Sequence, residues 1–211
     1  MRGQSLRRSE SSSQALFRRA CAIVVAVAAW VGAPARAETI DFTELPLNTV
    51  ANGAKVKGVT FGYTVNNVAS QDARFTATGP GLTTITTPPN LEAGTAGVLS
   101  LDFATPVTGF GFAYIASTPT ANPNGLTVTL TDPKGGMVSK QLAIDRIGNF
   151  AGVRFDDPSL TPVARVVIDP SFPVGGRFVV DNVTFTPIPE PTGLLALAGS
   201  AAVLLARRRC R

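Results

Sequence analysis

Apolar and polar residues alternate in short runs through the middle of the chain, without helical spacing. From Glu38 onward, runs rich in Val, Thr, Phe and Ile are broken by Gly, Pro, Asn or Asp. Alternation at every second position gives a strand one buried and one solvated face. The pattern predicts an all-β domain, a sandwich or a barrel. The expected strands are 39–43, 59–65, 73–78, 82–86, 97–103, 109–115, 126–131, 138–144, 150–155, 164–168 and 177–186.

Turn residues separate these runs. Asp132 to Gly136 reads Asp-Pro-Lys-Gly-Gly and predicts a hairpin turn, because Pro fixes φ and Gly accepts a positive φ. Ser117 to Gly125 is rich in Pro, Gly and Asn and predicts a loop. Gly109 and Gly111 lie inside an apolar run, where glycine weakens a strand, so we expect a bulge or a close backbone approach there.

The first 37 residues have the pattern of a secretory signal. An Arg- and Ser-rich stretch, 1–19, precedes the apolar run 20–31, and 32–37 ends in Ala35-Arg36-Ala37. Small residues at Ala35 and Ala37 predict cleavage after Ala37. The residues around Arg18-Arg19 fit twin-arginine export poorly, so the general secretion machinery is the expected partner.

Residues 187–211 have three consecutive parts. Pro189-Glu190-Pro191 is rigid, 192–206 carries no charge, and Arg207, Arg208 and Arg209 begin a basic end at 207–211. The fifteen apolar residues predict a helix of roughly 22 Å, which is shorter than the ~30 Å hydrocarbon core. Arginines after an apolar span stay on the cytoplasmic side. The segment therefore predicts a short transmembrane helix that anchors only marginally, with the domain on the far side of the membrane.

This order of parts resembles the PEP-CTERM sorting domain of Gram-negative bacterial surface proteins. The Pro-Glu-Pro motif, single transmembrane helix and Arg-rich end of that family match 189–191, 192–206 and 207–209. The resemblance implies that an exosortase-type sorting enzyme reads the tail. It also implies a transient stay in the inner membrane, delivery to the cell surface or the extracellular space, and an association with exopolysaccharide. A buried C-terminal helix is the alternative, although such a helix seldom ends in a run of arginines.

Charge and composition exclude several classes of function. Most of the excess positive charge lies in the two end segments, and residues 38–189 carry a net charge of about −3. This gives no support to nucleic-acid binding. The chain has no histidine, and Cys21 and Cys210 both lie outside the central region. Disulfides within the domain, His-dependent triads and Cys or His metal sites are therefore excluded.

Three segments of the central region are similar to jelly-roll, lectin-like sandwiches of such surface proteins. They are 40–42 (Ile-Asp-Phe), 101–112 and 178–185. The resemblance implies a jelly-roll-like antiparallel β-sandwich over 38–186, flanked by an N-terminal signal helix (1–37) and the short C-terminal transmembrane helix. The first and last strands of such folds usually pair, which would bring Asp41 near Asp181.

Asp181 is the main candidate for a binding site. By alternation it shares a face with Val179, Val183 and Phe185. If that face is the core, the buried carboxylate must be hydrogen-bonded or bound to a cation. Calcium, with Asp41 and Asp181 as ligands, is one interpretation, because calcium prefers carboxylate and carbonyl oxygens. The other is a structural Asp that accepts backbone N–H bonds. No other cofactor is expected.

Other chemistry is sparse. Asp156-Asp157-Pro158 is either a pair of acids or, as we expect, a solvated turn, because no nucleophile, base or oxyanion hole is near it in sequence. Aromatic residues suited to stacking on a sugar ring are limited to Tyr63 and Tyr114, since the single Trp lies in the signal.

The sequence as a whole favours a noncatalytic exported surface or extracellular-matrix protein, sorted through its tail. Association with exopolysaccharide and binding of glycan or calcium are the functions considered for its domain. The alternatives are a hydrolase acting on extracellular polysaccharide, which needs two carboxylates converging in a cleft, and a purely structural adhesin.

Overall fold

The computed structural model describes residues 36–79, 85–171 and 176–188. Within those ranges the fold is all-β, with no helix. The strands are β1 (Glu38–Ile40), β2 (Lys55–Val56), β3 (Val59–Val65), β4 (Val68–Ala69), β5 (Arg74–Thr76), β6 (Asn90–Gly94), β7 (Gly97–Ala116), β8 (Asn122–Thr131), β9 (Met137–Ile147), β10 (Phe150–Asp157), β11 (Val163–Pro170) and β12 (Arg177–Pro187). Every pairing between them is antiparallel.

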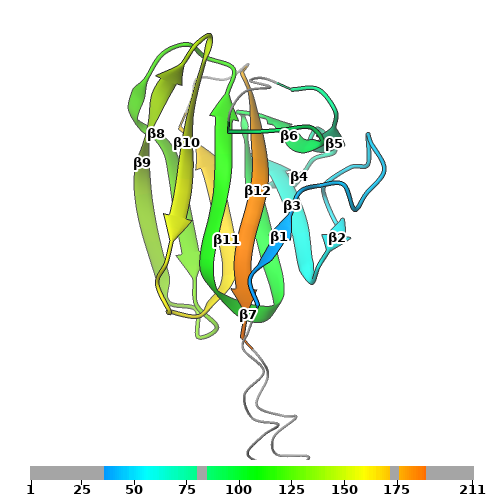
Figure 1. The fold of residues 1–211 in the computed structure, drawn as a ribbon, viewed down its shortest axis with the longest axis vertical. Helices are drawn as coiled ribbons and strands as arrows, with labels where there is room; N and C mark the ends of the chain where they lie inside the picture. Colours follow the sequence, from blue (N-terminus) through cyan, green and yellow to red (C-terminus); the bar gives the residue numbers. More distant parts are fainter. Residues whose placement is uncertain (1–35, 80–84, 172–175, 189–211) are drawn as a thin grey trace, which may run out of the picture. The chain divides into compact units, whose positions relative to one another are not determined.

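The long strand β7 belongs to two layers and joins them through an arch at the base of Figure 1. Its first part pairs with β3 and β11, and its second part pairs with β10 and β12. The strand reverses direction between these parts. The ring centroids of Phe103 and Phe110, on either side of the bend, are therefore only 5.9 Å apart. Gly109 lies in this turn with φ of 61°, a conformation that glycine adopts without strain.

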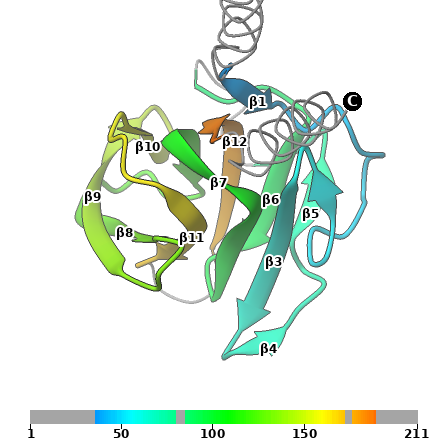
Figure 2. The same cartoon turned by 90° about the horizontal axis from the view of Figure 1, so that it is seen from below.

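The two layers also meet at one side. The strands β7, β11, β8, β9 and β10 pair in that order, and β10 pairs again with β7, so these five form a closed ring (Figure 2). On the other side the layers remain separate, with β3 in one and β12, β6 and β5 in the other. Apolar side chains from both layers fill a single core that includes Phe42, Phe61 and Phe75. Burial of such side chains is the main favourable contribution to folding.

The structure confirms the all-β prediction and the pairing of the first and last strands, because Glu38 lies opposite Phe185. The extent of several strands differs from the prediction. The expected strands 97–103 and 109–115 are confirmed as strand, but the structure joins them through residues 104–108 into one long strand, β7. Residues 122–125, predicted as loop, begin β8, where a register shift before Leu126 accommodates Pro and Gly. The strand β6 was not predicted, because Asn-Leu-Glu-Ala-Gly has little β-propensity.

Some predictions concern residues outside the described part of the chain. These are most of the signal (1–35, including Ala35), the sorting motif 189–191, the apolar segment 192–206, the basic end 207–211, and most of the expected strand 82–86. Ala37, within the described part, is exposed. No helix among the described residues has the length and apolarity that crossing a membrane requires. Residues 35–190 form one compact unit.

Candidate functional site

Neighbouring positions on the outer face of β10, β7 and β12 form a shallow trough. In one row Arg154 lies opposite Ala113, which lies opposite Asp181. In the next row Asp156 lies opposite Gly111, which lies opposite Thr184. We call this depression the trough, and it is lined by Phe112, Ala113, Arg154, Phe155, Asp156, Asn182 and Thr184. Its volume is about 250 Å³.

The trough is hollow because its central strand carries small residues. A Cβ atom added to Gly111 would lie 2.9 Å from Thr184 Oγ1 and 3.0 Å from the Phe155 carbonyl oxygen. These contacts are too short for any larger residue. The expected close backbone approach at Gly111, and the irregularity at Gly109, are therefore confirmed. The flanking strands carry longer polar side chains, which form the walls.

The segment before β6, here called the strap (residues 85–89), lies on the same outer face, next to the trough. The Ile85 Cδ1 atom lies 3.2 Å from the position that a Cβ would take on Gly152 of β10. The Thr87 N–H donates a 2.7 Å hydrogen bond to Asp181 Oδ2 on β12. The strap thus contacts both outer strands of this face. Ile115 and Val179, opposite each other beneath it, are buried outside the main core.

Asp181 does not lie on the core face, so the predicted face was wrong. Phe178 and Val180 face the core before it, and Val183 and Phe185 face the core after it. The change of phase occurs at Asn182, which has φ of 51° and lies where the β12 to β7 register shifts. This bulge places Asp181 on the outer face, although its side chain is 1% exposed. A bulge of one residue cannot be read from alternation alone.

Hydrogen bonds hold the Asp181 carboxylate in its buried position. Besides Thr87, the Asn182 N–H donates to Oδ1 at 2.7 Å and the Asn182 Nδ2 donates to Oδ2 at 3.1 Å. Burial raises the pKa of Asp181, and the N–H donors oppose that shift without cancelling it. These contacts are the ones expected of a structural Asp that fastens the strap.

Asp41 lies close enough for its negative charge to contribute to the raised pKa of Asp181. Its own carboxylate is exposed and accepts the Thr43 hydroxyl at 2.7 Å, and this bond is the main cause of a lowered pKa for Asp41. Among the described residues, no group of three or more Asp, Glu, His or Cys is arranged to hold a metal ion. Calcium binding by Asp41 and Asp181 stays a prediction.

The predicted solvated turn at Asp156-Asp157 is wrong. Both residues belong to β10 and point to opposite faces, with Asp156 at the trough and Asp157 buried. Lys140 Nζ lies 3.0 Å from Asp157 Oδ2 and 5.6 Å from the centre of the Phe155 ring. Burial acts to raise the pKa of Asp157, but the hydrogen bonds from Lys140 and Ser159 outweigh it and lower the pKa.

Lys140 and Asp157 line a second depression, at the end of the domain where the β8–β9 turn meets the β10–β11 loop. We call it the hairpin groove, and its volume is about 360 Å³. Its remaining lining is Leu130, Asp132, Gly136, Met137, Val138, Ser159, Thr161, Pro162 and Val163. The sequence offered no signal for this groove, because its two sides are far apart along the chain.

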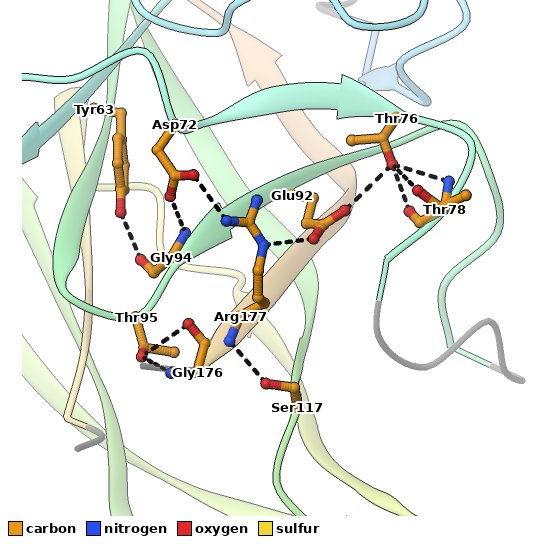
Figure 3. Close-up of polar contacts among 10 residues, drawn as sticks. All are labelled: Tyr63, Asp72, Thr76, Thr78, Glu92, Gly94, Thr95, Ser117, Gly176 and Arg177. Atoms are coloured by element: carbon orange, nitrogen blue, oxygen red, sulfur yellow. Dashed lines mark hydrogen bonds and ion pairs between the residues drawn. The ribbon is translucent and has the colours of Figure 1, made fainter. Parts of the chain in front are cut away.

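A polar cluster at the opposite end of the domain was also missed (Figure 3). Arg177 Nη1 donates to Asp72 at 2.8 Å, and Arg177 Nε donates to Glu92 at 2.5 Å. The second oxygen of Asp72 accepts the Gly94 N–H. These bonds raise the pKa of Arg177 although burial acts to lower it. Arg177 belongs to β12, Glu92 to β6, and Asp72 to the segment before β5. The cluster therefore joins these three parts of the fold, and both carboxylates are already paired with Arg177.

Neither tyrosine can stack on a sugar. Tyr63 and Tyr114 are both fully buried, and the Tyr63 hydroxyl donates to the Gly94 carbonyl at 2.6 Å. Burial also raises the pKa of Tyr114 strongly. A ligand of the trough would therefore meet polar side chains and small residues, without an aromatic platform.

No protein-family model matches the chain, and no curated protein matches it. Similar solved structures include a family 29 carbohydrate-binding module, 11% identical with a TM-score of 0.39, over 75% of this chain and 98% of that chain. A mutant of such a module complexed with mannohexaose is 10% identical with a TM-score of 0.39, over 71% and 91%.

Proposed function

We propose that this protein is a noncatalytic, exported surface or matrix protein whose jelly-roll-like domain binds extracellular polysaccharide in the trough. The observation that carries the proposal is the trough itself, a strip of small residues between walls of Arg154, Asp156, Asn182 and Thr184. Sugars present many hydroxyl groups, each a donor and an acceptor. The Asp156 carboxylate and the Asn182 amide oxygen can accept hydrogen bonds from these hydroxyls, and the Arg154 guanidinium can donate to them.

The geometry argues against the hydrolase alternative. Among the described residues, Asp156 is the acid in the lining of the trough, while Asp181 beside it is 1% exposed and accepts three N–H bonds next to the strap. A general acid must reach the glycosidic oxygen of its substrate. Asp181 has no such access, and Asp156 alone cannot supply both roles.

The pairing of β1 with β12 supports sorting through the tail. Glu38, the expected first residue of the mature chain, lies opposite Phe185 near the end of β12. The domain is thus complete before the tail begins, and removal of the signal leaves its strand ladder intact. The tail then connects the finished domain to an exosortase-type enzyme, first in the inner membrane and later at the cell surface.

Binding is tested with fragment 38–188 on a glycan array, followed by titration of the glycans it retains. Arg154→Ala and Asp156→Asn should each weaken binding about tenfold or more, which corresponds to roughly 1.4 kcal/mol. The matched control changes an exposed ion pair in the other layer, Arg165 with Asp102, which are 3.5 Å apart. Equal losses in trough and control variants would contradict a site in the trough.

Sorting is tested by Glu190→Ala in a host that carries the sorting enzyme. The residue lies beyond β12, so folding should be unchanged while processing stops and the full-length protein stays in the inner membrane. Deleting 192–211 should release the domain instead. Normal delivery of Glu190→Ala protein would show that the tail is an ordinary anchor.

A further inference from the structure

The arch of β7 and its neighbours form one end of the domain, here called the tail end. It comprises residues 104–108 of β7, the β8–β9 turn (132–136), the β10–β11 loop (158–162) and the end of β12. Val107 lies opposite both Val163 and Pro187, so β11 and the last residue of β12 flank the arch. The Ile188 N–H donates to the Pro106 carbonyl at 2.9 Å. This bond fixes the point at which the chain leaves the domain.

Large apolar side chains are exposed at this end. Leu160, in the β10–β11 loop, is 84% exposed, while Met137 and Val138, just after the β8–β9 turn, are 72% and 58% exposed. Met137 and Val138 line the hairpin groove, and Leu160 lies between its lining residues 159 and 161. Exposed apolar side chains on two elements that border the same groove mark this end as a candidate contact surface.

The turn that precedes Met137 and Val138 and the loop that carries Leu160 are held in place by hydrogen bonds. Asp132 Oδ1 accepts the Lys134 and Gly136 N–H groups at 2.7 and 2.9 Å, which fixes the turn before Met137. The Gly109 N–H donates to the Ser159 carbonyl, which ties the loop carrying Leu160 to the arch. The exposed apolar side chains therefore lie on backbone whose position is fixed by these hydrogen bonds.

The length of the connecting chain places this end near any membrane that the tail enters. Only residues 188–191 separate Pro187 from the apolar segment 192–206. At most about 3.5 Å per residue, the Cα atoms of Pro187 and Thr192 are no more than roughly 17 Å apart. If 192–206 is in the bilayer, the tail end lies within the depth of the headgroup region or just above it.

We propose that the tail end of the domain is a membrane-contact surface, with Leu160, Met137 and Val138 inserted among lipid headgroups while the tail holds the chain in the membrane. This inference rests on the membrane stage of the proposed function. Lys134 is exposed on the turn beside Met137 and suits an anionic lipid surface. The contact directs the opposite end of the domain, with the Arg177 cluster, away from the bilayer.

The test uses the full chain with a single tryptophan as reporter. The chain has one Trp, Trp30 in the signal, so a Trp30→Phe background is free of indole. Leu160→Trp places the reporter at the tail end. The matched control is Val68→Trp, because Val68 is 68% exposed in β4, which pairs with Val65 at the end of β3 away from the arch.

Each protein is reconstituted into vesicles of phosphatidylglycerol and phosphatidylethanolamine, with and without lipids brominated near the headgroup. We expect the fluorescence emission of the Leu160→Trp protein to lie at shorter wavelength in vesicles than in buffer without vesicles or detergent. We also expect the brominated lipid to reduce its intensity at least twofold. Val68→Trp emission should change in neither respect. Equal emission and quenching of the two reporters would overturn the inference.

Alkaline washing of the same vesicles separates this inference from the proposed function. Protein retained after washing, with Leu160→Trp unquenched, overturns the membrane contact and leaves the anchor standing. Protein lost on washing overturns both. The Leu160→Trp emission could instead shift without vesicles, in step with dimer formation measured by light scattering. That result would assign the surface to a second copy of the chain and would also overturn the inference.

Discussion

Replacing Asp181 by Asn tests whether its carboxylate fastens the strap. Oδ1 accepts one N–H and Oδ2 accepts two, all at 2.7 to 3.1 Å. In Asp181→Asn, one of these oxygens becomes an NH₂ group that faces an N–H donor. One hydrogen bond to a charged group is lost, at ~1.5–3 kcal/mol, and a buried donor is left without a partner. Relief from burying the charge offsets part of this, so we expect a net loss of about 2 kcal/mol.

The assay is urea unfolding of fragment 38–188 at pH 7, followed by circular dichroism. With a slope of ~2 kcal/mol per molar urea, the midpoint should fall by about 1 M. The control is Asp156→Asn, an exposed acid on the same face, which should change stability by no more than about 0.5 kcal/mol. A midpoint for Asp181→Asn equal to that of the parent would refute the fastening role.

The same measurement decides the calcium prediction. It is repeated with 5 mM calcium and with a chelator, at a concentration chosen on the order of extracellular affinities. If Asp181 only fastens the strap, neither addition moves the midpoint of the parent. If calcium raises the midpoint of the parent but not of Asp181→Asn, Asp181 holds the ion, and binding linkage explains the gain.

Three further predictions concern other residues. Asp157→Asn should lower stability at neutral pH. The folded-state pKa of Asp157 is lowered, so the stability difference between variant and parent should be fully present above the unfolded-state pKa near 3.8. It should vanish as pH falls through the folded-state pKa. Urea midpoints measured from pH 7 to about 2.5 test this. Gly111→Val should destabilise fragment 38–188 by about 2 kcal/mol or more, because its side chain meets Thr184 and backbone; thermal melting checks this. N-terminal sequencing of the exported protein should give Glu38 as the first residue, whereas a start before Ala20 would reject the predicted signal.

Alternation along the chain was sufficient for the fold class. Strand β3 (Val59–Val65) was predicted at its bounds, because its alternate residues pack on the core. Strand β12 (Arg177–Pro187) was predicted nearly at its bounds, because its Val, Phe and Thr residues favour a strand even though its alternation breaks at Asn182. The turn at Asp132 to Gly136 was also predicted correctly from the sequence, because proline fixes its own φ and glycine accepts a positive φ. These features depend on neighbours in sequence.

The trough and the strap depend on neighbours in space, and only the tertiary structure decided them. The residue Asp181 was singled out from the sequence, but the positive φ of Asn182 moved it to the opposite face. Its hydrogen-bond donor Thr87 is 94 residues away along the chain. Likewise Asp157 looked like part of a polar turn until the strand pairing brought Lys140 beside it. Contacts of this kind follow from strand register and from single bulges, and a one-residue change of register reverses every face that alternation assigns.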